Sequence, residues 1–279
     1  MTIVALIPAR NEAAGIADAI ASLRNQTRPP DRIVAVVNNC TDYGATYAAA
    51  RDCGVEVIHL QVCPGKKAGA LNVALDSLLP TLAATDAVLV MDADTELSPV
   101  FIESALPHLG RRTGAVGGIF YGRTGGGLLG QLQRMEYQRY GREIDRRHGR
   151  ALVLSGTGTV FMVNTLRRIK QARIDGELPG GTGYYSTASL TEDDEITKAV
   201  KTLGWKPLSP AGCDVVTDVM DTPSSLWNQR LRWQHGALKN LRSYGFTRVT
   251  AQYYLQQAMV GLGAVALLSY LVLIAASTT

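Results

Sequence analysis

The chain has 279 residues, of which 46% are hydrophobic and 19% are charged, and this composition excludes a disordered protein, which combines low hydrophobicity with high net charge. A formal net charge of +4 is small for this length, so electrostatics do not indicate a nucleic-acid partner and we expect none. The 28 glycines follow no G-X-Y period, which excludes a collagen-like fibre.

The first third of the chain alternates short strand patterns with helical ones. Apolar, β-branched runs predict strands at residues 2–7, 32–37, 55–60 and 87–91, and helical periodicity predicts helices at 11–25, 45–53 and 67–79. Pro8 follows the first run, and we expect it to end that strand because proline cannot donate to a sheet ladder. Strands separated by helices predict βαβ crossovers and a mainly parallel sheet.

Polar clusters follow three of these strands: PARNE after the first, NNCTD after the second and DAD after the fourth. Sheets of this kind bind ligands beyond the carboxyl ends of their strands, so we expect the site there. No GxGxxG follows a predicted strand and no GxxxxGK[ST] occurs, which leaves dinucleotide and P-loop sites without support.

Asp92 and Asp94 form a D-x-D motif at the end of the fourth predicted strand. A turn at that point can bring both carboxylates toward one cavity. Paired oxygen ligands there suit Mg²⁺ or Mn²⁺ bound together with substrate phosphates. Taken alone, the motif is weak and favours a solvated turn, because D-x-D occurs by chance in most large proteins.

An acidic run, TEDDE at residues 191–195, precedes a helical pattern. Thr191 and Asp194 resemble an N-cap with an acid near the positive end of the helix. That structural interpretation does not require four adjacent acids, whose repulsion raises the pKa of at least one of them. A carboxylate with a raised pKa is a candidate general base.

The QRLRW segment places Gln229, Arg232 and Trp233 on one face of a predicted helix. Arginine can neutralise phosphate charge, and an indole can stack on a sugar or a base. The alternative is a membrane-proximal amphipathic helix with snorkelling arginines.

The sequence allows two structural interpretations for each of two further segments. Residues 131–150 carry six arginines against three acids, and they are either a basic helix against anionic lipid or an ordinary solvated helix. Residues 175–189 are either a plain connection or a mobile lid.

Residues 258–276 contain no charged side chain. The length of this uncharged segment approaches the length of about 20 residues that a membrane-spanning helix needs. The alternative is a buried core helix. Lys239, Arg242 and Arg248 precede the segment and no Lys or Arg follows it, so the positive-inside rule places the bulk of the chain in the cytoplasm. The N-terminus lacks the pattern of a secretory signal, and the four cysteines have no CxxC spacing, which fits a reduced, cytosolic protein.

Seven segments in order resemble the processive glycosyltransferase family 2, the group of cellulose, hyaluronan, chitin and poly-N-acetylglucosamine synthases. They run from PARNE through NNCTD, GKKAGALN, DAD, SGTGTVF and TEDD to QRLRW. The resemblance implies an α/β fold of the GT-A (Rossmann-like) type, with a mixed, mainly parallel sheet, flanking helices, and C-terminal amphipathic and membrane helices. It also implies a catalytic domain at 1–222, an interfacial helical segment at 223–254 and a transmembrane helix at 255–279.

The activity that the resemblance implies is inverting, metal-dependent hexosyl transfer. A hexose or N-acetylhexosamine would move from a UDP-sugar to a saccharide acceptor in polysaccharide synthesis, in a membrane-associated protein with a cytoplasmic catalytic domain; a homo-oligomer is left open. Asp193 would be the catalytic base, with Glu192 and Thr191 beside it, and Asp94 would hold Mg²⁺ or Mn²⁺. The donor would contact Pro8, Ala9, Glu12, Asn38, Lys67, Asp92, Gln229, Arg232 and Trp233. The acceptor would contact Gly156, Thr157, Gly158 and Trp233.

The chain departs from the family pattern in two places. Many members carry an aspartate pair where Asn38 and Asn39 stand, and many have several membrane helices where this sequence has at most one. A single span favours an alternative, the non-processive transfer of one sugar to a lipid-linked acceptor, whereas the QRLRW segment argues against it. An inactive, membrane-anchored interaction protein and a sugar-nucleotide pyrophosphorylase are further alternatives; the intact motifs argue against the first, and the missing glycine- and arginine-containing phosphate loop against the second.

Overall fold

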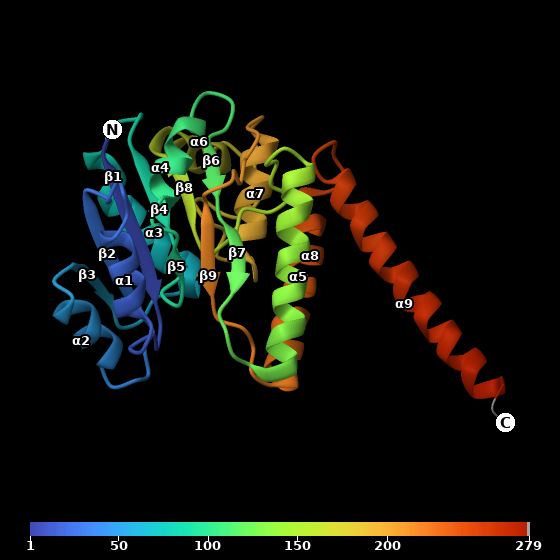
Figure 1. The fold of residues 1–279 in the computed structure, drawn as a ribbon. Helices are drawn as coiled ribbons and strands as arrows, with labels where there is room; N and C mark the ends of the chain where they lie inside the picture. Colours follow the sequence, from blue (N-terminus) through green and yellow to red (C-terminus); the bar gives the residue numbers. More distant parts are fainter. Residues whose placement is uncertain (278–279) are drawn as a thin grey trace.

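A six-stranded sheet forms the centre of the structure, a computed structural model that describes residues 1–277 (Figure 1). In spatial order its strands are β3 (Glu56–Leu60), β2 (Arg32–Asn38), β1 (Ile3–Ala9), β4 (Ala87–Val90), β8 (Thr159–Met162) and β6 (Ala115–Gly117). The first four are mutually parallel, and β8 runs antiparallel to both of its neighbours. The prediction of a mixed, mainly parallel sheet is confirmed.

A second, three-stranded sheet lies beside the first. Its order is β5 (Glu96–Leu97), β9 (Asp214–Thr217) and β7 (Ile119–Gly122). The long helix α5 (Gly127–Arg146) covers β7, where Tyr137 and Tyr140 pack on the ring of Phe120. The arginine-rich segment of the sequence is therefore helical, with one side anchored to this small sheet.

Helices cover both faces of the main sheet, because each buried strand presents alternate residues to opposite sides. Val4 and Leu6 of β1 contribute to one core, and Ile3, Ala5 and Ile7 to the other. The first core is completed by α3 (Lys66–Leu78), η1 (Leu79–Thr81), α6 (Val163–Ile174) and α7 (Glu192–Thr202). The second is completed by α1 (Ile16–Arg24), α2 (Ala45–Asp52), α4 (Phe101–Ala105) and the start of η2 (Leu106–His108).

The expectation that Pro8 ends the first strand is wrong, because β1 continues through Pro8 to Ala9. On one side β1 pairs with β2 as far as Ala9, but on the other its register with β4 ends at Leu6. Leu6 O accepts from Met91 N on the β4 side. Pro8 faces the same side two residues later, beyond the end of β4, so its missing N–H leaves no ladder bond unmade.

The first helix also begins later than its apolar pattern predicts, at Ile16 rather than near residue 11. Asn11 has a φ of +59°, in the left-handed region, which a helix cannot continue. The residues before Ile16 instead form a loop in which Glu12 O accepts from Ile16 N. This loop places Glu12 at the carboxyl edge of the sheet.

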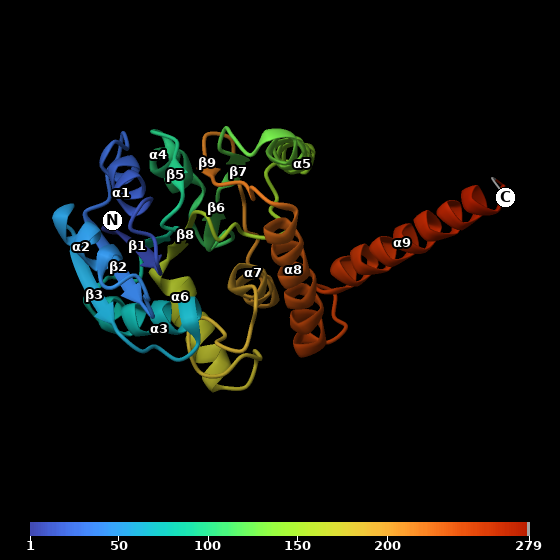
Figure 2. The same ribbon diagram turned by 90° about the horizontal axis from the view of Figure 1, so that it is seen from below.

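Two helices end the described chain. The first, α8 (Pro223–Tyr244), starts with a capping box formed by Thr222 and Ser225. The second, α9 (Ala251–Ser277), extends away from the rest of the molecule in both views (Figures 1 and 2). Within residues 1–277 it is the one helix long and apolar enough to cross a membrane, and its residues from 258 onward are all exposed.

Candidate active site

The centre of the candidate site is an ammonium group held between two carboxylates. Lys67 Nζ lies 2.6 Å from Asp92 Oδ1 and 2.7 Å from Glu192 Oε1. Gly65 and Lys66 both have positive φ at the start of α3, and this turn precedes Lys67 in the first turn of the helix. Burial disfavours the charged amine, but Asp92 and Glu192 hold the pKa of Lys67 well above its ordinary value. Lys67 therefore remains a cation at the edge where β4 ends.

Asp193 lies beside this group with a carboxyl that titrates near neutrality. Burial, followed by the charge of Glu192, raises the pKa of Asp193 to about 7. Its Oδ1 accepts from Asp194 N at 2.8 Å. The other oxygen, Oδ2, is 3.5 Å from the point where a Cβ on Gly156 would stand. A carboxyl with this pKa can accept a proton at neutral pH.

The neighbouring Glu192 has the opposite tendency. Burial favours its neutral form, yet Lys67 holds the pKa of Glu192 below its ordinary value. Two adjacent carboxyl groups thus have their pKa values driven apart by their surroundings, which is how acid–base roles are divided in enzyme sites. Glu192 stays ionised as the partner of Lys67, and Asp193 is left as the candidate base.

A second group of acids surrounds Asp94. Burial and the charge of Asp92 raise the pKa of Asp94, and burial with the charges of Asp94 and Asp92 raises the pKa of Glu12 to about 7. Carboxylates in this arrangement repel one another and supply the hard oxygen ligands that Mg²⁺ and Mn²⁺ prefer. No group of three His, Cys, Asp or Glu residues arranged to hold a metal is found in residues 1–277. The residues fit a cation bound by one or two carboxylates together with diphosphate oxygens and water.

The residues at the ends of β1 and β2 are mostly engaged with the backbone. Pro8 and Ala9 are buried, and the amide of Asn38 donates to Ala9 O at 3.4 Å and Val36 O at 3.2 Å. Asp42 accepts from Thr46 through Oδ2. Its Oδ1 is buried and has no protein partner among the described residues. An unsatisfied buried oxygen is costly, so Asp42 keeps an acceptor available near the carboxyl end of β2.

A glycine-containing turn forms the wall facing the base. The hydroxyls of Ser155 and Thr157 are hydrogen-bonded to each other, and Thr159 Oγ1 donates to Ser155 O at 2.8 Å. A Cβ on Gly156 would have Lys67 and Asp193 as its nearest neighbours, whereas a Cβ on Gly158 would meet Leu97 and Val215. Of the predicted acceptor residues, Gly156 borders the space beside Asp193 and Gly158 packs toward the small sheet.

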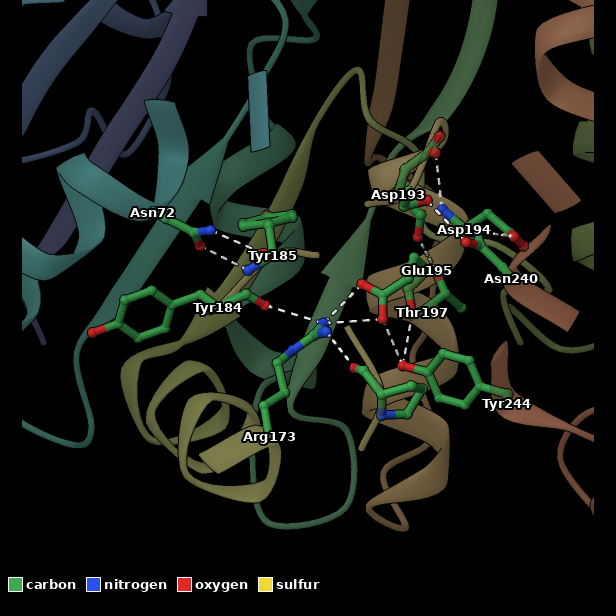
Figure 3. Close-up of polar contacts among 12 residues, drawn as sticks. Asn72, Arg173, Tyr184, Tyr185, Asp193, Asp194, Glu195, Thr197, Asn240 and Tyr244 are labelled. Atoms are coloured by element: carbon green, nitrogen blue, oxygen red, sulfur yellow. Dashed lines mark hydrogen bonds and ion pairs between the residues drawn. The ribbon is translucent and has the colours of Figure 1, made fainter. Parts of the chain in front are cut away.

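The last two acids of the TEDDE run bond to side chains of other helices (Figure 3), Glu195 between Arg173 and Tyr244 and Asp194 beside Asn240. Glu195 forms a buried ion pair with Arg173 at 2.7 Å, and Asp194 pairs with Lys198. Thr191 occupies the N-cap position of α7, but its side chain makes no capping bond to the helix. The four acids therefore divide into two that face the site and two that anchor the helix.

The QRLRW segment lies on α8 as predicted. Trp233 is 37% exposed, and Arg230 covers its ring at 4.4 Å. Arg232 is exposed, and its charge contributes to the low pKa of Glu192. Gln229 Oε1 is buried without a partner among the described residues. The indole retains exposed surface, and Arg232 stands on the side of Glu192.

Sequence reasoning missed Tyr185 and the contact that holds it. Tyr185 lines the small cavity at the centre of the site with Lys67, Gly156 and Asp193. Asn72 clamps its backbone by accepting from Tyr185 N at 2.8 Å and donating to Tyr185 O at 2.9 Å. Asn72 belongs to the GKKAGALN segment, but only the fold reveals which part of the 175–189 loop it binds.

The sheet order, the carboxylates at its carboxyl edge and the helix that follows the acidic run define a GT-A-like α/β protein. Residues 2–236 match the family model described as "Glycosyltransferase like family 2". Because this match covers most of the chain, the chain belongs to that family, and the resemblance drawn from the motifs is confirmed.

The curated relatives are distant. The poly-β-1,6-N-acetyl-D-glucosamine synthase of Staphylococcus epidermidis is 25% identical over 241 residues, which are 83% of this chain and 53% of that protein. The synthase of the same name from Staphylococcus aureus strain COL is 27% identical over 243 residues, with the same shares. The chain thus spans about half the length of the curated relatives it matches.

Solved structures share the fold at low identity. A mannosyltransferase from Pyrobaculum calidifontis, solved with GDP-mannose and Mn²⁺, has a TM-score of 0.62 at 18% identity and covers 89% of this chain and 66% of its own. Glucosyl-3-phosphoglycerate synthase from Mycobacterium tuberculosis, solved with Mn²⁺, UDP and phosphoglyceric acid, has a TM-score of 0.52 at 19% identity and covers 88% and 79%. These likenesses confirm the GT-A-like architecture.

Proposed function

We propose that this chain is a metal-dependent, inverting hexosyltransferase that moves a hexose or N-acetylhexosamine from a UDP-sugar to a saccharide acceptor in polysaccharide synthesis. One observation carries the proposal: Asp193, whose pKa is raised to about 7, lines a small cavity with Gly156, beside the Lys67–Asp92–Glu192 group. Family membership and the names of the curated relatives support it.

Each residue of the site has a task in this reaction. Asp193 removes the proton of the acceptor hydroxyl, which attacks the anomeric carbon from the face opposite the diphosphate. Lys67 and Asp92 orient the donor, and Arg232 faces the developing charge of the leaving diphosphate. Gly156 leaves room for the acceptor, and Trp233 offers it a stacking surface.

A divalent cation, Mg²⁺ or Mn²⁺, would be held by Asp94, with Glu12 and Asp92 adding negative charge to its surroundings. Bound there, it would neutralise charge on the leaving diphosphate. Solved GT-A-like neighbours contain Mn²⁺ with GDP-mannose or UDP, which supports this assignment. We expect EDTA to abolish transfer and added Mg²⁺ or Mn²⁺ to restore it. We expect Asp94→Ala to lower UDP affinity only when metal is present; wild-type activity unchanged by EDTA would contradict the metal assignment.

The exposed apolar helix α9 supports membrane association. The basic residues Lys239, Arg242 and Arg248 before it favour a cytoplasmic catalytic part. Helix α9 also keeps a second function under consideration, the non-processive transfer of one sugar to a lipid-linked acceptor. The division into a catalytic part at 1–222, a helical segment at 223–254 and a membrane helix at 255–279 stays a prediction.

The test is a panel of UDP- and GDP-sugars with Mg²⁺ or Mn²⁺, read by nucleoside diphosphate release and by the mass of the product. We expect UDP release with a UDP-hexose or UDP-N-acetylhexosamine and a ladder of products on a saccharide primer. A single added sugar on a lipid-linked acceptor would favour the second function. No release from any donor would contradict both.

A further inference from the structure

One face of α8 is docked on the first turn of α7, the helix that carries Asp193. Residues spaced by four along a helix share a face, and Gly236, Asn240 and Tyr244 form such a row. A Cβ on Gly236 would overlap the side chain of Thr191, so the two helices approach closely there. Tyr244 OH donates to Glu195 Oε1 at 2.7 Å at the other end of the row.

Asn240 is the polar centre of this contact (Figure 3). Its side chain is 3% exposed, and its Nδ2 donates to Asp194 Oδ2 at 2.8 Å and to Thr191 Oγ1 at 3.2 Å. Its Oδ1 accepts from Ser189 Oγ at 2.9 Å. The buried amide of Asn240 therefore links α8 to Ser189 and Thr191, which precede α7, and to Asp194 in the first turn of α7.

The same row continues toward the QRLRW segment. Arg232 precedes Gly236 by four residues, so it stands on the α7 side of the helix. The influence of Arg232 on the pKa of Glu192 is consistent with this placement. Arg232 and Asn240 belong to one continuous helix, α8, so a shift of that helix at Asn240 would also move Arg232.

We propose that Asn240 is a positioning residue, which holds α8 against the first turn of α7 and thereby keeps Arg232 on the side of Glu192. Thr191 takes part in the same contact and serves as the docking point for α8. The inference rests on the proposed glycosyl transfer, because its effect is on the group that faces the leaving diphosphate.

The test is a double-mutant cycle between Asn240→Ala and Arg232→Lys, which keeps the charge but loses the guanidinium fork. We expect each single variant to lower kcat by about tenfold with a smaller change in KM for the donor. If Asn240 acts through Arg232, the double variant should lose only about ten- to twentyfold, since residues that share one function are not additive. An additive loss of about a hundredfold would overturn the inference.

Gln26→Ala is the matched control. Gln26 is also a buried amide, and it donates to Ser22 O and Ser98 O and accepts from Ile102 N, at the opposite side of the main sheet. We expect it to lower the melting temperature as Asn240→Ala does, while its effect on kcat simply adds to that of Arg232→Lys. If Gln26→Ala and Arg232→Lys were as non-additive in kcat as Asn240→Ala and Arg232→Lys, the effect of Asn240 would be a general loss of stability. That result would overturn the inference.

Tyr244→Phe tests the same contact between α8 and α7 if Asn240→Ala does not fold. It removes one hydroxyl from the same row, and Glu195 keeps its bonds to Arg173. We expect a loss of about threefold in kcat that disappears in the Arg232→Lys background, and an additive loss would overturn the inference. A wild-type chain that turns over no nucleotide sugar would overturn the proposed function as well, whereas additivity in an active enzyme overturns this inference alone.

Discussion

Asp92 and Glu192 are far apart in the chain, yet both bind the ammonium group of Lys67. The contact joins the end of β4, the start of α3 and the start of α7 in one charged cluster. Its removal should change the titration of the candidate base, because the charge of Lys67 lowers the pKa of Asp193 and opposes burial.

Lys67→Met should therefore raise the pKa of Asp193 and move the acid limb of the pH–rate profile to higher pH. In the wild type, transfer should increase as pH rises through about 7, because Asp193 must be ionised to accept a proton. The measurement is kcat/KM against pH for both proteins. Lys170→Met, which removes a surface lysine paired with Asp76, is the control and should leave the profile unchanged; an unshifted profile for Lys67→Met would contradict the assignment.

Asp193→Asn should remove most transfer, by about 10²–10⁴-fold, since the amide cannot act as a base. It should also stabilise the fold above neutral pH. The folded-state pKa of Asp193, about 7, is higher than the ordinary 3.8, so its contribution to stability is complete below about pH 4 and is lost as pH rises through 7. Melting temperatures at pH 5 and pH 8 test this: the variant should gain on the wild type at pH 8.

Asp194→Asn is the matched comparison for that variant. Asp194 is paired with the fully buried Lys198 and accepts from Asn240, so its neutralisation leaves a buried cation without its partner. We expect a clear loss of melting temperature with substantial transfer remaining. Should Asp194→Asn be the inactive protein and Asp193→Asn the active one, the base has been misassigned.

Gly156→Ala should fold normally but transfer poorly. The added Cβ would stand 3.4 Å from Lys67 Nζ and 3.5 Å from Asp193 Oδ2, in ordinary van der Waals contact, so the protein itself has room for it. The space that it fills is the one in front of the base. We expect an unchanged melting temperature and UDP affinity, with KM for the acceptor raised about tenfold or more; unimpaired transfer would place the acceptor elsewhere.

Truncation after Gln257 should release the protein from membranes or detergent while the fold is kept. The first turns of α9 are docked, since Tyr253 OH bonds with Lys201 and Leu152 O and Gln257 bonds with Gln234. Beyond them the helix is exposed and apolar. We expect the truncated chain to be monodisperse in buffer, with the melting temperature of the full chain; a full-length chain that is monodisperse without detergent would contradict a membrane role for α9.

Periodicity and motif order in the sequence were sufficient to predict the βαβ alternation, the parallel sheet, the helical QRLRW segment and the family. These features depend on local apolar spacing and on short segments whose residue types are tied to their chemistry. The sequence could not assign different roles to the four acids of the TEDDE run, because adjacent carboxylates are equivalent until the fold places a different partner beside each of them. Lys67 binds Glu192, while Arg173 and Lys198 take Glu195 and Asp194.

Tertiary structure also decided three features that no local pattern contains. Pro8 lies within β1 because β4 ends before it, Asn72 holds Tyr185 at the site, and Asn240 joins α8 to α7. In each case the deciding element comes from a distant part of the chain, so the outcome depends on packing that the local sequence does not specify. Short-range propensity determined the elements of this protein, and the long-range placement of buried charges and amides determined which two acids of the TEDDE run face the site.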